Sequence, residues 1–356
     1  MGTISFARGV PAPECLPVEE LADCARTVLE RDGRTVLSYG PSSGYGPLLD
    51  WLAARHDVDP SRIFVTNGSL QGFVFLAQRL APGRRVIVEQ PTYDRPLKIL
   101  RELGAEIVPV ACDEEGLDPD ALERELENGD AAFLYVIPTF QNPSGRTLGL
   151  ERRLRVVELA REHDLLVLED DPYGLVRFEG EPLPSLLELS DGETAYSSSF
   201  SKTIAPGLRV GWFVLPEQLA GEIAARATGT YITPVLLGQA TAYEFVARGL
   251  FEPNLERVRG LLGARRDAML AALDLRLGEA RISRPEGGYF VWLTLDGVDS
   301  GDLLERAEQA GVTFVKGTDF GGDASSLRLA YSFVSTDEIA EGVDRLASVL
   351  ALTTTA

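Results

Sequence analysis

The sequence has few of the residues on which metal sites and disulfide scaffolds depend. Its 356 residues include three cysteines, Cys15, Cys24 and Cys112, and no CxxC pair. So few cysteines argue against a disulfide scaffold and a cysteine zinc site. The two histidines, His56 and His163, are too few for a histidine metal centre or a Ser–His–Asp triad. Both end segments with a helical pattern, so we interpret them as structural and expect no metal.

Positive charge and long apolar runs are also scarce. Asp and Glu number 54 against 34 Lys and Arg, which gives a net charge of −20. Such an acidic surface repels nucleic acids and anionic membranes. No apolar run approaches the ~18 residues of a membrane-spanning helix, and no basic-then-apolar signal pattern opens the chain. We therefore expect a cytoplasmic protein that binds neither nucleic acid nor a membrane.

Lysine is the third scarce residue, because arginine carries nearly all the positive charge. It occurs only as Lys98, Lys202 and Lys316. Chemistry that needs a lysine amine must therefore use one of these three side chains.

Short apolar segments alternate with longer amphipathic ones through most of the chain. This alternation predicts an α/β fold with a mostly parallel sheet sandwiched by helices. We expect seven strands, at residues 63–66, 85–89, 106–110, 132–137, 165–168, 195–198 and 210–215. The intervening helices are expected at residues 71–80, 95–103, 119–126 and 150–163.

The pattern changes after about residue 253 and predicts a second, smaller α+β unit. Its expected elements are helices at 255–273, 301–310 and 336–350 and strands at 287–293, 312–315 and 327–330. We therefore predict a large domain over residues 40–250 and a small C-terminal domain over 251–356. Residues 1–39 are expected to pack across both.

The segment Ser199-Phe200-Ser201-Lys202, with Arg209 seven residues later, carries the clearest chemistry. A lysine amine whose pKa is lowered by burial or a nearby cation can form a Schiff base with an aldehyde. Two serine hydroxyls and a guanidinium are the donors that a phosphate monoester needs. An aldehyde that carries a phosphate describes pyridoxal 5'-phosphate. For the tetrapeptide alone, an ordinary serine-rich loop is the alternative interpretation.

A strand–turn–helix segment, Thr66-Asn67-Gly68-Ser69-Leu70, predicts an anion site. Gly68 permits close backbone approach, and Ser69 with the free N–H groups of the first helical turn can bind an anion. An ordinary N-capped helix explains the same residues.

Three consecutive carboxylates, in Glu169-Asp170-Asp171-Pro172-Tyr173, follow an apolar strand at the edge where open α/β sheets bind ligands. They repel one another unless at least one meets a cation. A protonated pyridine nitrogen paired with Asp170 is such a cation, and Tyr173 could then bind the 3-oxygen of the ring. A metal ion is the rival interpretation, disfavoured because no histidine is near in sequence.

Three further residues have a functional and a plain interpretation each. Asn142 in Gln-Asn-Pro-Ser-Gly could donate to the same 3-oxygen or merely form a turn. Tyr93 could stack on the cofactor ring or belong to the core. Arg328, between apolar residues on a strand, could bind the α-carboxylate of an amino acid or form a structural ion pair.

Taken in order, these residues resemble the pyridoxal-phosphate enzymes of fold type I. More narrowly, they resemble the class I/II aminotransferases of the 2-aminoadipate and kynurenine aminotransferase subgroup. The resemblance runs nearly end to end, from FARGVPAPECLP at residues 6–17 to SLRLAYS at residues 326–332.

The resemblance implies a role for each of these residues. Lys202 matches the Schiff-base lysine and proton shuttle, Asp170 the partner of the pyridine nitrogen, and Tyr93 the stacking ring. Asn142 and Tyr173 match the ligands of the 3-oxygen. The phosphate would be held by Ser69, Leu70, Ser199, Ser201 and Arg209, and the substrate by Arg328 with Asn142. Tyr39 matches a tyrosine that reaches the phosphate of the neighbouring subunit, which implies a homodimer. The implied activity is the transfer of an amino group from an L-amino acid to a 2-oxo acid.

The sequence departs from the family at Leu70, where close relatives often carry Gln, and at Lys316 and Ala330, where Pro and Ser are common. Two other functions use the same scaffold. One is a pyridoxal-phosphate lyase, cyclase or oxidase of an amino acid. The other is a ligand-sensing module of a transcription factor, which is disfavoured by the acidity of the chain and by the 38 residues that precede Tyr39.

Overall fold

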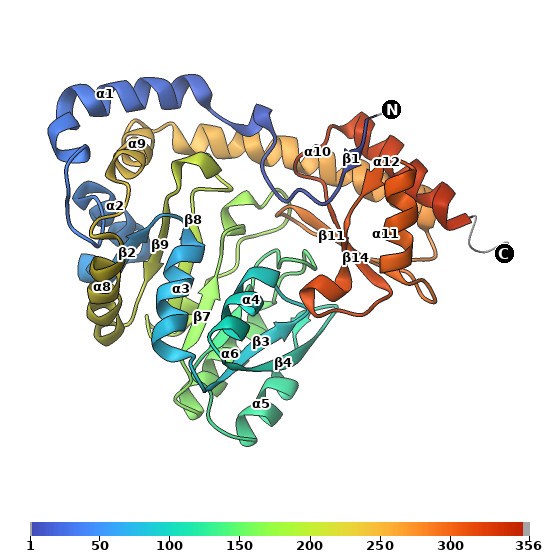
Figure 1. The fold of residues 1–356 in the computed structure, drawn as a ribbon, viewed down its shortest axis with the longest axis horizontal. Helices are drawn as coiled ribbons and strands as arrows, with labels where there is room; N and C mark the ends of the chain where they lie inside the picture. Colours follow the sequence, from blue (N-terminus) through green and yellow to red (C-terminus); the bar gives the residue numbers. More distant parts are fainter. Residues whose placement is uncertain (1, 352–356) are drawn as a thin grey trace.

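The computed structural model describes residues 2–351 and contains a large eight-stranded sheet (Figure 1). The strand order is β2-β9-β8-β7-β6-β3-β4-β5. The bounds are β2 (Ile63–Thr66), β3 (Arg85–Gln90), β4 (Glu106–Asp113), β5 (Gly116–Leu117), β6 (Leu134–Val136), β7 (Val167–Asp170), β8 (Ala195–Ser199) and β9 (Gly211–Val214). The five strands from β8 to β4 are parallel, β9 runs antiparallel to them, and β2 pairs antiparallel with β9 and so runs in the same direction as the five.

All seven strands expected in this part of the chain are present, and their alternation with helices confirms the α/β class. The eighth strand, β5, is a two-residue addition that turns back on the end of β4. Its brevity explains why no periodic pattern indicated it.

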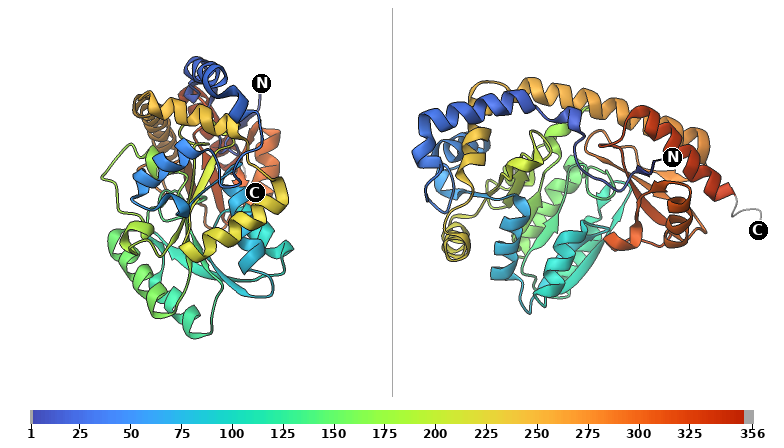
Figure 2. Two further views of the ribbon diagram at one scale, coloured as in Figure 1. Left: turned by 90° about the vertical axis from the view of Figure 1, so that its left-hand side faces the viewer. Right: turned by 45° about the horizontal axis from the view of Figure 1, so that its top comes forward.

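Helices cover both faces of the large sheet, as Figures 1 and 2 show. On one face, α3 (Ser69–Leu80), α4 (Asp94–Glu102) and α8 (Glu217–Tyr231) pack through a shared apolar cluster. The other face is covered by α2 (Gly46–His56), α5 (Pro119–Glu127), α6 (Leu150–Glu162), α7 (Leu186–Leu189) and α9 (Leu236–Ala247). This double cover explains the unbroken apolar runs of the central strands.

The C-terminal part forms a second, antiparallel sheet of order β10-β11-β14-β13. Its elements are α10 (Phe251–Leu277), β10 (Arg281–Ile282), β11 (Phe290–Thr294), α11 (Ser300–Gln309), β12 (Val312–Thr313), β13 (Val315–Lys316), β14 (Ser326–Ala330) and α12 (Thr336–Ala351). Figure 2 shows α10 running from the large sheet to this unit.

Two strands of the C-terminal part differ from expectation. The strand expected at 287–293 begins only at Phe290, because Gly288 has a φ of +75° and both Gly287 and Gly288 pack tightly against Phe140. The strand expected at 312–315 is two short strands, of which β12 pairs with the N-terminal segment and β13 with β14.

The N-terminal segment contacts the C-terminal unit and the helical cover of the large sheet. Strand β1 (Ile4–Ser5) pairs with β12, and α1 (Val18–Val36) shares an apolar cluster with α9. The expected division of the chain at residues 39/40 and 250/251 remains a prediction.

Residues 2–351 bear on two expectations from the sequence, which concern a membrane-spanning helix and a metal site. No helix in this range is long and apolar enough to cross a membrane. Within the same range, no group of three or more His, Cys, Asp or Glu side chains is arranged to hold a metal ion.

Candidate active site

The candidate residues gather at the carboxyl ends of the parallel strands, beside the C-terminal sheet. Asp170 ends β7, Lys202 follows β8, and Asn142 lies in the loop after β6. Arg328, on β14 of the C-terminal sheet, donates a hydrogen bond of 2.8 Å to the Oδ1 of Asn142. Open α/β sheets bind their ligands at this edge, and here the second sheet covers it.

Lys202 lies in a setting that favours its neutral amine. Its Nζ donates to the carbonyl oxygen of Gly9 at 2.9 Å and lies 5.2 Å from the centre of the Tyr289 ring. Burial, Arg328 and Arg209 lower the pKa of Lys202 to about 8. A lysine with a lowered pKa is a nucleophile near neutral pH. Lys202 is thus chemically distinct from an ordinary surface lysine.

Asp170 holds one carboxylate oxygen ready for a cation. Its Oδ2 accepts a 2.7 Å hydrogen bond from the hydroxyl of Tyr135, whereas Oδ1 is buried with no partner among the described residues. Burial raises the pKa of Asp170 to about 6, and hydrogen bonds from Tyr135 and Ser197 oppose the rise. At neutral pH the carboxylate is therefore mostly ionised, and a protonated ring nitrogen would satisfy its free oxygen.

The two carboxylates beside Asp170 have structural partners. Glu169 accepts from the backbone N–H of Leu187 at 3.0 Å, and Asp171 accepts from that of Gly174 at 2.8 Å. In the register with β8, Glu169 points to the opposite face of the sheet from Asp170, because side chains alternate along a strand. Of the three, only Asp170 faces the candidate site.

A cradle for an anion forms where β2 meets α3. Gly68 caps the helix with a φ of +90°, and a Cβ at this position would collide with the guanidinium of Arg209. That guanidinium donates to the carbonyl of Asn67 at 3.1 Å. Ser69 begins the helix, and the N–H groups of Ser69 and Leu70 precede the first intrahelical hydrogen bonds, the position at which helices bind anions.

The serines of the Lys202 loop complete this cradle. The hydroxyls of Ser199 and Ser201 lie 2.8 Å apart. Gly211 pairs with Ser199 across β8 and β9, and a Cβ on Gly211 would collide with the backbone of Ser69. The two serines and the helix start are therefore close neighbours. Hydroxyls, a helix N-terminus and a guanidinium are a donor set that suits a phosphate monoester.

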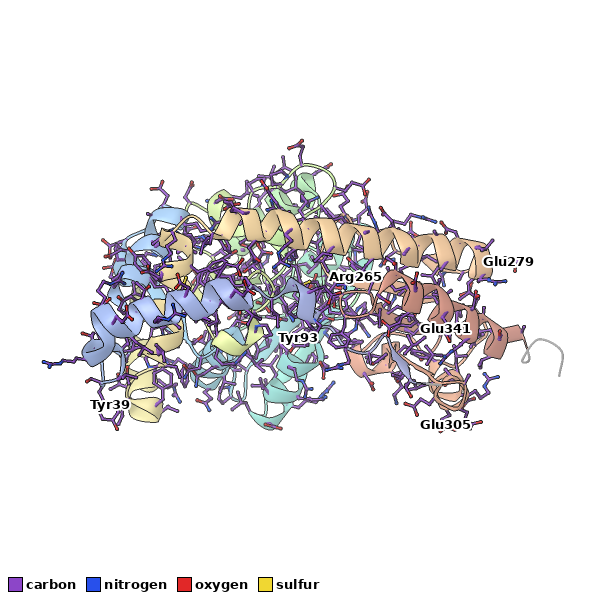
Figure 3. All side chains as sticks on the ribbon, turned by 90° about the horizontal axis from the view of Figure 1, so that it is seen from above. Tyr39, Tyr93, Arg265, Glu279, Glu305 and Glu341 are labelled. Atoms are coloured by element: carbon purple, nitrogen blue, oxygen red, sulfur yellow. The ribbon has the colours of Figure 1, made fainter. Side chains whose placement is uncertain are left out.

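A small cavity of about 60 Å³ adjoins the cradle. Its lining includes Ser69, Leu70, Tyr93 and Asp170. Tyr93 stands at the N-terminus of α4, and Figure 3 shows it near the middle of the molecule. Leu70 and Tyr93 therefore lie beside the buried carboxylate of Asp170.

Arg328 lies between two aromatic rings. Its guanidinium is 4.2 Å from the centre of the Phe290 ring and 4.8 Å from that of Phe320. One nitrogen donates to the carbonyl of Ala7 at 2.9 Å, and Nε has no partner within residues 2–351. Burial lowers the pKa of Arg328 to about 10, so it remains a cation at neutral pH. No carboxylate pairs with it in this part of the chain, which argues against the structural ion pair and leaves it able to bind an anionic substrate group.

Asn142 and Tyr173 retain donors for a further acceptor. Asn142 uses its amide oxygen to accept from Arg328, so the amide hydrogens remain for another group. Tyr173 is buried, with its ring edge-on to Phe290 at 5.7 Å, and burial raises the pKa of its phenol. The phenol is therefore a neutral donor at physiological pH.

Tyr39 is the one candidate that lies away from the others within the single chain. It is 79% exposed, and Figure 3 shows it at the far end of the molecule from the C-terminal unit. Its role in a neighbouring subunit remains a prediction.

Several contacts in the site were not expected from the sequence. The carbonyls of Ala7 and Gly9 bind Arg328 and Lys202, and Tyr135 binds Asp170. Tyr135 lies in an apolar strand, where only its alternation with neighbouring residues could have pointed to it. The contacts of Ala7 and Gly9 depend on the path of the N-terminal segment, which the pattern of polar and apolar residues does not indicate.

Comparison with protein families gives a match over nearly the whole chain. The family model for aminotransferase class I and II matches residues 5–346. The 2-aminoadipate transaminase of Thermus thermophilus is 40% identical over 98% of this chain and 90% of its own length. Aromatic-amino-acid aminotransferase 1 of Thermococcus litoralis is 34% identical over 98% of this chain and 88% of its own.

Solved structures agree with the sequence relatives. The alpha-aminoadipate aminotransferase of Thermus thermophilus, complexed with N-(5'-phosphopyridoxyl)-L-leucine, superimposes with a TM-score of 0.95 at 37% identity, covering 100% of this chain and 94% of that one. The fold expected from sequence is confirmed, with its large sheet and smaller C-terminal unit. The orphaned Asp170 oxygen and the donor set of the cradle fit pyridoxal 5'-phosphate. The chain belongs to the class I and II aminotransferases of fold type I, enzymes that use this cofactor to move an amino group from an amino acid to a 2-oxo acid.

Proposed function

We propose that Lys202 is the residue that binds the cofactor covalently and moves the proton during amino transfer. Asp170 binds the ring nitrogen, Asn142 and Tyr173 bind the 3-oxygen, and Tyr93 stacks on the ring. The phosphate is held by Ser69, the backbone of Leu70, Ser199, Ser201 and Arg209. Arg328 binds the α-carboxylate of the substrate, next to Asn142.

The observation that carries this proposal is the contrast among the three lysines. Lys98 and Lys316 expose 55% and 40% of their side chains and pair with aspartates. The Lys202 amine contacts a backbone carbonyl and two tyrosine rings, and no carboxylate of residues 2–351 forms an ion pair with it. It is the lysine suited to act as a nucleophile.

Bound pyridoxal phosphate supplies an aldehyde carbon that takes up the amino group and a ring that accepts an electron pair from the α-carbon of the donor. The Asp170 carboxylate holds a proton on the ring nitrogen, which keeps the ring electron-poor. Once displaced by the donor amine, the Lys202 amine is free to remove the α-proton of the substrate and to deliver it to the C4' carbon.

Arg328 orients the amino acid for this proton transfer. Its guanidinium already faces the site through its contact with Asn142, and its Nε is without a partner in the described chain. A carboxylate accepts two parallel N–H bonds from such a fork. Arg328 is buried, with the rings of Phe290 and Phe320 close to its guanidinium, so little water reaches the site and an ion pair there is stronger.

A homodimer completes the site in this proposal, with Tyr39 reaching the partner's phosphate. Leu37, Tyr39, Ile232 and Val235 are all exposed. Asn67 of the cradle accepts a hydrogen bond from the N–H of Val235 at 2.9 Å, so this apolar surface adjoins the phosphate site. A second copy that covers the surface would bring its own Tyr39 close to the cradle.

The dimer is tested by particle mass and by Tyr39→Phe. We expect a particle of twice 38.6 kDa for both proteins. The variant should bind pyridoxamine phosphate less tightly, because it lacks the hydroxyl. A monomer with full cofactor affinity would contradict the dimeric site.

We also propose a cytoplasmic location, supported by the three free cysteines and the acidity of the chain.

The residue roles are tested with Lys202→Ala and a screen of amino donors. In the wild type, each true donor should convert bound pyridoxal phosphate to pyridoxamine phosphate, and 2-oxoglutarate should reverse the conversion. We expect Lys202→Ala to lose the visible absorbance of the bound aldehyde and nearly all turnover, whereas Lys98→Ala should keep both. Full activity of Lys202→Ala would refute the assignment.

A further inference from the structure

The two carboxylate oxygens of Asp170 have different hydrogen-bonding partners. Oδ2 is held by the Tyr135 hydroxyl at 2.7 Å, and Oδ1 is buried without a partner within the described chain. A free carboxylate can rotate about its Cβ–Cγ bond, whereas one held at a single oxygen presents the other in a fixed direction. The direction of Oδ1 therefore depends on Tyr135.

Tyr135 is itself fixed in place by its strand and its neighbours. It lies on β6 opposite Leu168 of β7, two residues before Asp170, so both side chains point to the same face of the sheet. Tyr135 is 1% exposed, and the edge of its ring packs against Phe73 with 5.4 Å between ring centres. The ring cannot swing away without opening the core between β6 and α3.

We propose that Tyr135 is a positioning residue for the cofactor, because its hydroxyl holds Asp170 with Oδ1 toward the ring nitrogen and stabilises the charged carboxylate. This inference rests on the proposed role of Asp170. It implies that Tyr135, which also lines the small cavity beside Asp170, helps to keep the proton on the ring nitrogen by acting through Asp170.

The surroundings of Asp170 make this hydrogen bond important. Burial and the neighbouring Asp171 raise the pKa of Asp170, and Tyr135 and Ser197 lower it. Glu89 and Tyr93 also interact with Asp170 electrostatically. No arginine, lysine or histidine appears among the groups that shift the pKa of Asp170 in the described chain. Neutral donors therefore stabilise the carboxylate until the cofactor arrives.

The chain contains a matched control for Tyr135. The hydroxyl of Tyr196 donates to the Oδ2 of Asp171 at 3.2 Å, also from a buried strand position. Tyr196 lies opposite Glu169 on β8, so it points to the other face of the sheet, away from the candidate site. Tyr135→Phe and Tyr196→Phe each remove one tyrosine–carboxylate hydrogen bond. Only the bond removed by Tyr135→Phe involves the carboxylate that is proposed to bind the cofactor.

The test compares the affinity of the cofactor-free proteins for pyridoxamine 5'-phosphate, which forms no bond to Lys202. We expect Tyr135→Phe to raise the dissociation constant about tenfold or more, the usual effect of losing a hydrogen bond to a charged group. Tyr196→Phe should stay within about twofold of the wild type. In Tyr135→Phe reconstituted with ¹⁵N-labelled pyridoxal phosphate, the ring-nitrogen resonance should move toward its unprotonated position. An unchanged affinity and an unchanged resonance in Tyr135→Phe would overturn the proposal.

A second pair of variants separates this role from a general loss of packing. In an Asp170→Ala background the Tyr135 hydroxyl has no carboxylate to hold, so adding Tyr135→Phe should change the affinity less than about twofold. A further tenfold loss in that background would show that Tyr135 acts independently of Asp170 and would overturn the inference. If the wild type does not bind pyridoxamine phosphate at all, the proposed function itself is wrong. If the wild type binds it and Tyr135→Phe binds it equally well, only the role of Tyr135 is wrong.

Discussion

The reactivity of a single amine depends on what surrounds it, and at Lys202 the surroundings are a carbonyl, two tyrosine rings and two distant guanidiniums. The carbonyl and the rings stabilise the ammonium ion, but burial and the guanidiniums of Arg328 and Arg209 outweigh them and lower the pKa of the amine. The same reasoning applies to Arg328, which is placed between rings and keeps one nitrogen without a partner in the described chain. Both side chains therefore keep nitrogen atoms available for a ligand, Lys202 as an amine of lowered pKa and Arg328 as a cation.

The lowered pKa of Lys202 predicts how fast the cofactor-free protein binds pyridoxal phosphate at each pH. The neutral amine attacks the aldehyde, and with a pKa of about 8 it makes up about one tenth of the population at pH 7. The attachment rate should rise about tenfold from pH 6 to 7 and level off above 8. Stopped-flow absorbance measures this rate, and a rise that continues to pH 10 would contradict the lowered pKa.

Arg328→Lys tests the carboxylate-binding role. Lysine keeps the charge but loses the planar fork, so the KM for amino acid donors should rise about tenfold or more. An amine that lacks the α-carboxylate should be affected little. Arg281→Lys, at an exposed ion pair with Asp296, is the control and should leave KM unchanged. An equal rise in KM for the amine and the amino acid would show that Arg328 acts on something other than the carboxylate.

At the scale of elements, the site depends on how two strands and one helix approach each other. The N-terminus of α3 lies against β9 because Gly211 lacks a side chain, and the missing side chain of Gly68 leaves room for the guanidinium of Arg209. This close approach brings the free N–H groups of the helix beside Arg209 and the serines that follow β8. The phosphate cradle is thus a property of the junction rather than of any single residue.

Gly68→Ala should disrupt this junction. The added methyl group collides with the Arg209 guanidinium, and the backbone must hold a φ of +90°, so we expect cofactor affinity to fall about tenfold or more. Gly83→Ala has a similar backbone strain, with a φ of +69° and open space at the Cβ, and serves as the control. Equilibrium dialysis with pyridoxamine phosphate compares the two. Equal affinities would mean that the cradle tolerates displacement of Arg209.

Sequence patterns predicted the elements well where burial is uniform along a segment. The strand at residues 63–66 and the helix at 119–126 follow from apolar runs and helical spacing alone. The late start of β11 could not be predicted, because it depends on Phe140 packing against Gly287 from a distant loop. Tyr135 was missed for a similar reason, since its partner is set by the register between strands.

The residues of the candidate site could be predicted from the sequence, but their detailed contacts could not. The residue types Lys, Asp, Ser and Arg at strand ends indicate a phosphate-bearing aldehyde, and the structure brings Ser69, Ser199 and Arg209 together. The carbonyls of Ala7 and Gly9 at the two cationic side chains depend on the path of a segment far away in sequence. Backbone carbonyls leave no trace in a residue pattern.

At the scale of the whole molecule, the sheet buries more carboxyl groups than it pairs with cations. Burial raises the pKa of both Glu89 and Glu169 to about 8. Glu89 accepts from the N–H of Ile137, and Glu169 from that of Leu187. In the folded protein both carboxyls are therefore largely protonated near neutral pH, whereas the unfolded chain has released these protons.

This difference predicts a stability that depends on pH. The folded pKa values exceed the unfolded ones, so the contribution of each group is fully present below a pH of about 4.5 and is lost as the pH rises to about 8. Each group should lower the free energy of unfolding by up to about 1.4 kcal/mol per pH unit in that window. Urea unfolding of the cofactor-free protein at pH 5 to 8 measures the slope.

Glu169→Gln should make this slope shallower, because the neutral amide resembles the protonated carboxyl at every pH. Glu106→Gln, on an exposed edge of β4, should leave the slope as in the wild type. A Glu169→Gln protein with the wild-type slope would show that Glu169 is ionised in the folded state.

The most direct measurement of the central claim is the position of the cofactor on the chain. Protein saturated with pyridoxal phosphate is reduced with borohydride, digested, and its peptides are weighed by mass spectrometry. We predict one phosphopyridoxyl group per chain, on the peptide that contains Lys202. A group found on Lys98 or Lys316 instead, or no group on any lysine, would contradict the account.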